Sequence, residues 1–136
     1  MGQWRETVIR FLLVVLGSGI GGGLRLLLSV LIQTKLGPVF PYGTLAVNLA
    51  GSFALGAFFA VRERTLLLGP DLWLFLGTGL CGGFTTMSTF SFETLALLRE
   101  RELYYAGLNL TLTLIGCLAA VAAGYLTLRM FTGLPR

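Results

Sequence analysis

Residues 82–91 read GGFTTMSTFS, and this stretch decides how the chain can fold. It lies inside a longer apolar segment, residues 72–98, that is otherwise suited to a membrane-spanning helix. Two adjacent glycines and two adjacent threonines have a weak helix preference, so the sequence predicts a break at this point. At ~1.5 Å per residue, the parts before and after the break each cover about half of a ~30 Å hydrocarbon core. We therefore expect the break near the membrane midplane.

A broken helix at this depth has a specific chemistry, because irregular backbone is tolerated there only beside protein or a water-filled cavity. The second half-helix points its partly positive N–H groups at the break, which favours an anion. The first half-helix ends in free carbonyls at residues 82–85, which suit a cation such as Na⁺. Hydroxyl donors follow in the sequence at Thr86, Ser88, Thr89 and Ser91. A glycine-rich kink that only lets another helix cross is the simpler alternative, and the residues alone leave both open.

The rest of the chain consists of three further apolar stretches, residues 8–32, 42–61 and 103–131. Of the 136 residues, 55% are hydrophobic and 12% are charged, and the mean hydropathy is +0.84. A soluble domain has about 25% charged residues, and four spans of about 20 residues use most of this length. The sequence therefore predicts an all-α membrane protein of one domain, residues 1–136, with four transmembrane helices. No room remains for a soluble catalytic domain.

Charged residues lie mainly in the short connections between the apolar stretches. They form no basic patch, so we expect membrane lipid and no nucleic acid as a partner. In membrane proteins Arg and Lys set the orientation. Six basic residues lie on the side of the two termini and three on the other: Arg5, Arg10, Arg62, Arg64, Arg129 and Arg136 against Lys35, Arg99 and Arg101. This excess favours cytoplasmic termini in a cell inner (plasma) membrane, and it is small enough to permit insertion in both orientations.

Polar residues also occur inside the apolar stretches. Asn48 lies within the second stretch, and its amide carries two N–H donors. Arg25 lies deep in the first, where a charge is costly and usually functional. In the fourth stretch four polar residues recur four positions apart and share a helix face: Tyr105, Asn109, Thr113 and Cys117. Neutral donors with one cation fit an anion, although for Thr113 a hydrogen bond to a neighbouring helix is the simpler interpretation.

Glu93 is the only acidic residue inside the predicted spans, and it lies near the end of the third. A small multidrug-type exporter of cations needs a carboxylate that faces its substrate cavity, so this class is the second hypothesis. A structural membrane subunit without transport is the third. The sequence contains no nucleophile–base pair, metal cluster or phosphate loop, so we expect no enzymatic activity.

Two segments carry a resemblance to a known family. GTLAVNLAGSF at residues 43–53 and GGFTTMSTFSFE at residues 82–93 resemble the Fluc/CrcB family of fluoride channels. The glycine-rich first stretch that ends in Arg25 looks like the family's N-terminal motif, and the resemblance covers essentially the whole chain. It implies a passive channel that exports fluoride from the cytoplasm. It also implies an antiparallel dual-topology homodimer with two fluoride pores.

The resemblance implies roles for individual residues as well. Asn48 matches the family's pore asparagine, a donor to fluoride. Arg25 matches the first-span arginine, which we expect near an entrance vestibule. Gly82 and Thr85 match the positions whose main-chain carbonyls hold a structural Na⁺ at the centre of the dimer.

The family's pore carries two phenylalanines whose ring edges face fluoride. Phe90 matches the second, whereas Met87 stands at the first, a departure from the pattern. A thioether lacks the positive edge of an aromatic ring, but it is polarizable and fills the space, so we expect conduction to survive. Ser88 and Thr89 match hydroxyls along the pathway. Helical face alone places three residues of the fourth span beside them: Tyr105, Asn109 and Thr113.

Overall fold

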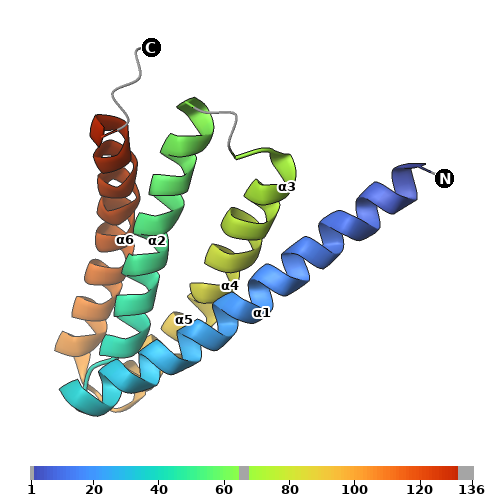
Figure 1. The fold of residues 1–136 in the computed structure, drawn as a ribbon. Helices are drawn as coiled ribbons and strands as arrows, with labels where there is room; N and C mark the ends of the chain where they lie inside the picture. Colours follow the sequence, from blue (N-terminus) through green and yellow to red (C-terminus); the bar gives the residue numbers. More distant parts are fainter. Residues whose placement is uncertain (1, 65–67, 132–136) are drawn as a thin grey trace.

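The computed structural model describes residues 2–64 and 68–131, and this part of the chain is helical without strands (Figure 1). The prediction of an all-α protein is therefore confirmed for these residues. One element, η1, is a π-helix that continues the helix before it. The elements in order are α1 (Gly2–Leu36), α2 (Tyr42–Arg64), α3 (Pro70–Trp73), η1 (Leu74–Cys81), α4 (Gly82–Phe84), α5 (Met87–Arg99) and α6 (Leu103–Phe131).

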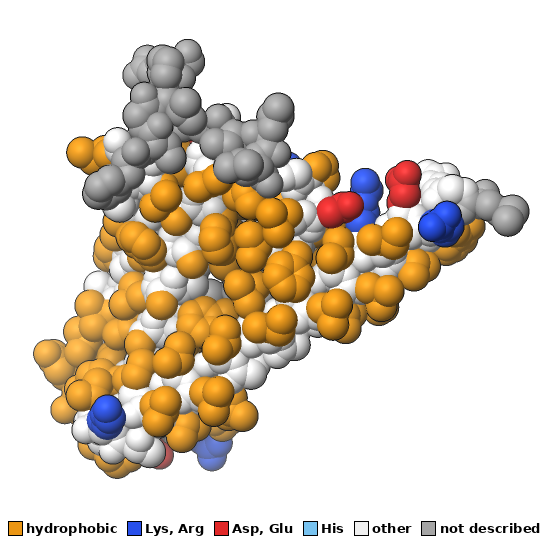
Figure 2. Space-filling view, viewed as in Figure 1, with side chains coloured by type: hydrophobic (Ala, Val, Ile, Leu, Met, Phe, Trp, Pro, Cys, Tyr) orange, Lys and Arg blue, Asp and Glu red, His pale blue; other side chains and the backbone are white. Residues whose placement is uncertain are grey.

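Among the described residues three helices, α1, α2 and α6, are long and apolar enough to cross a membrane. Large apolar side chains are exposed along them, for example Leu26 at 65% on α1 and Leu118 at 74% on α6. In the view of Figure 2, hydrophobic side chains cover the middle of the molecule, and charged ones lie toward its two ends. An apolar surface of this extent needs lipid or protein to cover it. The chain is therefore a multi-pass membrane protein.

The first two helices extend beyond the apolar stretches that predicted them. α1 covers Gly2–Leu36, against the expected 8–32, and α2 continues to Arg64. Apolar composition locates the part of a helix that suits lipid, whereas the helix itself continues until its backbone is interrupted. For α1 that point is Gly37, whose φ of +97° is left-handed and whose N–H donates to the carbonyl of Gln33 at 3.0 Å. Pro38 follows and does not continue the helix.

The third apolar stretch is not one continuous helix. It is helical through α3, η1 and α4, and Thr85 and Thr86 then have extended backbone, with φ and ψ of −84° and 158° and of −149° and 115°. Helix α5 begins at the next residue, Met87. We call Thr85 and Thr86 the interruption.

The helices approach one another through glycines. A Cβ atom on Gly17 of α1 would lie 2.5 Å from the carbonyl oxygen of Phe75 in η1, and one on Gly124 of α6 would collide with the carbonyl of Phe53 in α2. Such backbone contact is typical of membrane helices. α2 and α6 lie side by side, while α1 runs obliquely across the face of η1 and α4 (Figure 1).

Charged side chains gather at the end of the molecule where α1 and α3 begin and α2 finishes. The guanidinium of Arg62 stacks over Trp73 at 4.6 Å, and Arg10 lies 3.7 Å from the exposed carboxylate of Asp71. Arg136 and the side chain of Arg64, both counted in the orientation argument, lie outside what the structure describes.

Candidate functional site

A groove of about 660 Å³ opens beside the interruption. Its walls come from α2, η1, α4, the interruption, the start of α5 and α6, and they mix apolar side chains with amide and hydroxyl groups. Residues predicted from the sequence lie together in this groove, among them Asn48, Gly82, Thr85, Thr86, Met87 and Thr113. Met87 is 63% exposed there.

Asn48 joins α2 to the interruption by two hydrogen bonds. Its Oδ1 accepts from the backbone N–H of Thr86 at 2.7 Å, and its Nδ2 donates to the carbonyl oxygen of Thr86 at 3.1 Å. The amide thus supplies partners to a residue whose extended backbone has left the helical hydrogen-bond pattern. Asn48 is 5% exposed, and its Nδ2 makes this one hydrogen bond among the described residues. Because an amide has two N–H groups, one donor is left beside the groove.

The hydroxyl groups gather at the start of α5. The Oγ1 of Thr86 accepts from the backbone N–H of Thr89 at 3.1 Å, which makes Thr86 the N-cap of α5. The same hydroxyl donates to Oγ1 of Thr89 at 3.0 Å and lies 3.2 Å from Oγ of Ser88. Ser88 and Thr89 are exposed. Because the Thr86 proton goes to Thr89, Ser88 donates in the second contact and Thr89 keeps its own hydroxyl proton at the helix N-terminus, a favourable place for an anion.

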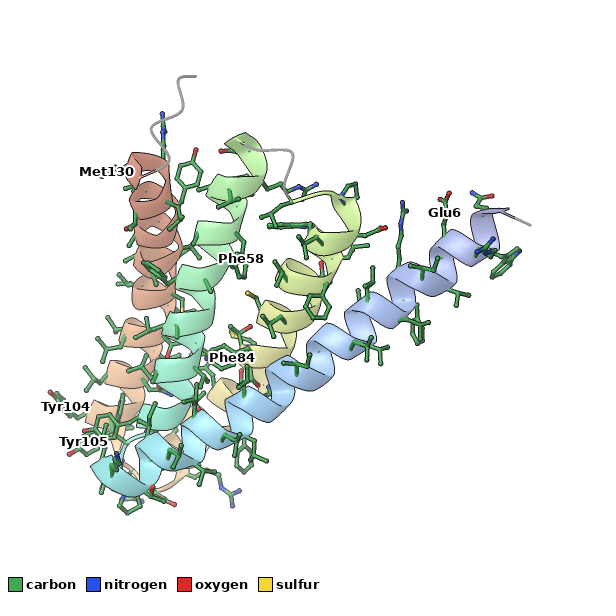
Figure 3. The ribbon with its side chains drawn as sticks, viewed as in Figure 1. Glu6, Phe58, Phe84, Tyr104, Tyr105 and Met130 are labelled. Atoms are coloured by element: carbon green, nitrogen blue, oxygen red, sulfur yellow. The ribbon has the colours of Figure 1, made fainter. Side chains whose placement is uncertain are left out.

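Arg25 reaches the interruption from α1. Its Nη1 donates to the carbonyl oxygen of Thr85 at 3.4 Å, so the half-buried guanidinium lies at the interruption itself. The other groups of Thr85 turn back into η1, where its N–H and its hydroxyl both donate to the carbonyl of Cys81 at 3.0 Å. Phe84 packs against Gly51 of α2 (Figure 3).

Asn109 lies in a closed network between α5 and α6. It is 0% exposed; its Nδ2 donates to Oγ1 of Thr94 at 2.9 Å, and its Oδ1 accepts from Thr113 at 3.4 Å. Thr94 in turn donates to the carbonyl of Phe90 at 2.7 Å. Thr94 was not named as a candidate from the sequence. Its hydroxyl lies four residues after Phe90 inside an apolar helix, and this position could have indicated a polar contact between helices. Asn109, Phe90 and Tyr105 do not line the groove.

A second cleft, of about 460 Å³, lies where the connection after α1 meets α5. Gln33, Thr44, Thr89 and Glu93 are among its lining residues. Thr44 donates to Oε1 of Glu93 at 2.8 Å, and Oε2 is buried without a hydrogen-bond partner among the described residues. Its place near the end of a span made Glu93 a poor candidate for a residue that faces a cavity. In the structure it nevertheless lines this cleft. Gln33 and Thr44 were also missed as candidates.

The described residues contain no group of three His, Cys, Asp or Glu side chains that could hold a metal ion. A cation here would therefore be held by backbone carbonyl oxygens. Gly82 and Thr85 border the groove and belong to the end of a helix, where carbonyls lose their helical partners.

Comparison with known proteins gives consistent matches. A family model described as "CrcB-like protein, Camphor Resistance (CrcB)" matches residues 12–125. A protein of Anaeromyxobacter dehalogenans named "Fluoride-specific ion channel FluC" is 45% identical over 124 residues, which are 91% of this chain and 98% of that protein. "Fluoride-specific ion channel FluC 2" of Rhodopseudomonas palustris is 42% identical over 128 residues, 93% of this chain and 98% of the relative. The FluC protein of Shewanella amazonensis is 46% identical over 113 residues, 83% and 90% of the two chains.

Proposed function

The chain belongs to the CrcB family, and from this premise we propose that it is a fluoride-specific ion channel that lowers cytoplasmic fluoride by passive export. Relatives that align over nearly their whole length carry the name of a fluoride-specific ion channel. The structural observation that carries the proposal is the groove, where the amide of Asn48 and the start of α5 meet at the interruption. The chain is accordingly a channel and not an enzyme.

The chemistry of fluoride fits these groups. Fluoride is small and strongly hydrated, so a selective path has to replace its water with hydrogen-bond donors at close range. The remaining N–H of Asn48, the hydroxyl of Thr89, the N-terminus of α5 and, once its proton turns away from Thr86, the hydroxyl of Ser88 are such donors. None of them carries a full charge, and conduction requires sites that release the ion as well as bind it.

The proposed pathway contains all the residues expected from the sequence, but their positions in the structure support them to different degrees. Asn48, Met87 and Thr113 border the groove, Ser88 is the exposed residue next to Met87, and Thr89 lines the second cleft, so the ion is assigned to these five first. Phe90, Tyr105 and Asn109 would form the wall of the path behind these five residues. The complete set is Asn48, Met87, Ser88, Thr89, Phe90, Tyr105, Asn109 and Thr113. Arg25, bonded to Thr85, would hold the interruption and supply a positive charge near it.

We further propose the antiparallel, dual-topology homodimer as the working form, in the cell inner (plasma) membrane. In the single chain the groove is open, and apolar side chains at its rim, Met87 at 63% and Leu118 at 74%, are exposed. A second copy would cover them. The small difference in basic residues between the two sides permits the two orientations that such a dimer needs.

The same dimer would hold a structural Na⁺ on the carbonyls of Gly82 and Thr85. The residues fit this ion, because the N–H of Thr86 donates to Asn48 instead of donating to Gly82, as it would in a continuous helix. The carbonyl of Thr85 accepts from Arg25 with one lone pair and has a second. When bound, Na⁺ would supply positive charge at the centre of the dimer.

A multidrug-type exporter is not favoured, since the relatives are named as fluoride channels and Glu93 is engaged by Thr44. Purified protein in liposomes loaded with potassium fluoride tests the proposal. We expect fluoride efflux that requires valinomycin, moves no protons and does not occur for chloride. Efflux coupled to protons would support an exporter, and a protein that passes no fluoride would support a structural subunit.

A further inference from the structure

The side chain of Gln33 ties the end of α1 to the connection that leads into α2. Its Nε2 donates to the carbonyl of Gly37 at 2.6 Å and to that of Phe40 at 2.9 Å, and its Oε1 accepts from the N–H of Gly43 at 3.0 Å. Both N–H donors and the acceptor of the amide are therefore used on backbone groups. A polar residue that only ended a span in lipid would not need three partners.

The connection is short of backbone donors, although the buried ring of Phe40 also holds it by packing on Tyr42 and Tyr105. Pro38 and Pro41 contribute no N–H, and Gly43 lies in the first turn of α2, where helix N–H groups lack partners. Gln33 supplies that partner from another helix. Gly43 also packs directly on the backbone of Ser29, where an added Cβ would collide. The hydrogen bond to Gln33 and this backbone contact therefore both hold the start of α2 against α1.

The residue after Gly43 is Thr44, which holds Glu93 by its hydroxyl at 2.8 Å. Gln33, Thr44, Glu93 and the pathway residue Thr89 all border the 460 Å³ cleft. The orientation of a carboxyl group beside an anion path matters. An oxygen that carries negative charge repels fluoride, whereas an O–H group attracts it. A hydrogen bond weakens steeply once its donor–hydrogen–acceptor angle falls below about 120°.

Resting on the proposed function, we propose that Gln33 is a positioning residue for fluoride transport. Its amide fixes the start of α2, so that Thr44 holds the Glu93 carboxyl in one orientation on the wall of the cleft. Gln33 makes no contact with the ion in this role. The rate of fluoride efflux therefore depends on three hydrogen bonds to the connection.

A double-mutant cycle tests this proposal. Gln33→Met keeps the length of the side chain and removes all three hydrogen bonds, and we expect fluoride efflux to fall about ten-fold, because only part of the free energy of the three bonds acts on the transport step. Thr44→Val should lower efflux similarly, whereas Thr44→Ser, which keeps the hydroxyl, should restore it. In the Thr44→Val background, Gln33→Met should add less than about a two-fold further loss.

The matched control is Thr34→Val, one residue along α1, whose hydroxyl donates only to carbonyls of its own helix, those of Val30 and Leu31. It should leave efflux unchanged. Thermal unfolding of the same proteins in detergent gives a second readout, in which the Gln33 and Thr44 effects should also be less than additive. If Gln33→Met does not fold, Gln33→Asn, whose amide is one methylene too short, takes its place.

The outcomes separate the two proposals. Effects of Gln33 and Thr44 that multiply in efflux and add in the unfolding midpoint would overturn the positioning role while leaving the channel intact. A wild-type protein that passes no fluoride would overturn the proposed function. In that case non-additive midpoints would still support Gln33 as the residue that positions Thr44, and additive midpoints would overturn it.

Discussion

Asn48 and Asn109 have the same side chain, and both lie inside apolar helices, but the regions around them differ. Asn48 bonds to the backbone of Thr86 and keeps one N–H beside a groove. Asn109 is completely buried and bonds to the hydroxyls of Thr94 and Thr113. A membrane-helix amide that meets hydroxyls of a neighbouring helix joins the helices, whereas one that meets a backbone segment outside any helix can both hold that segment and serve a ligand.

The largest expected effect is that of Asn48→Asp. The carboxylate would still accept from the N–H of Thr86, but it would lose the donors and place a negative charge beside the groove. We expect fluoride efflux from proteoliposomes to fall to the level of empty liposomes, because like charges repel strongly in a medium of low dielectric constant. Near-normal efflux would count against the assigned pathway and would remove the distinction between the two asparagines.

Asn109→Leu should show the opposite pattern. It removes the partner of the Thr113 hydroxyl and one partner of Thr94, so we expect a loss of stability of about 1–3 kcal/mol in detergent. Efflux per folded protein should fall much less than for Asn48→Asp. A folded Asn109→Leu protein without efflux would show that Asn109 lies on the ion path and not behind it.

Thr86→Val sharpens the comparison on the Asn48 side, because it removes the N-cap hydroxyl but keeps both backbone groups that Asn48 binds. We expect a loss of about 1 kcal/mol, typical of an N-cap, together with slower efflux. Thr111→Val is the matched control, since that exposed hydroxyl donates only within α6, to Gly107 at 2.9 Å. Equal effects of the two substitutions would argue against a special role for the start of α5.

The smallest expected effect is that of Met87→Phe on the rim of the groove. A phenyl ring offers a positive edge, and a contact of roughly 0.5–1 kcal/mol would raise efflux about three-fold. Initial rates from the same proteoliposomes measure it, with wild-type protein as the reference. A complete loss of efflux would mean that this chain depends on the smaller thioether.

Much of the fold could be predicted from local sequence, but much less of the candidate site could. The paired glycines and threonines pointed to residues 82–86, and within them the structure has the glycines helical in α4 and the threonines extended. The partner of Asn48 is 38 residues away in the sequence, and Thr44 and Glu93 are 49 apart. No periodicity encodes such pairs, because they depend on how the helices pack. For the same reason Gln33 could be interpreted only as the end of a span.

The length of α1 ties this site to the lipid around it. Its apolar stretch, residues 8–32, spans about 37 Å at ~1.5 Å per residue, which exceeds a hydrocarbon thickness of ~30 Å. An apolar stretch longer than the hydrocarbon core accommodates by tilting, and α1 runs obliquely to α2 and α6 in Figure 1. Tilt changes with acyl-chain length, and Arg25 on this helix bonds to Thr85. We therefore expect the thickness of the bilayer to affect the ion path through the guanidinium of Arg25.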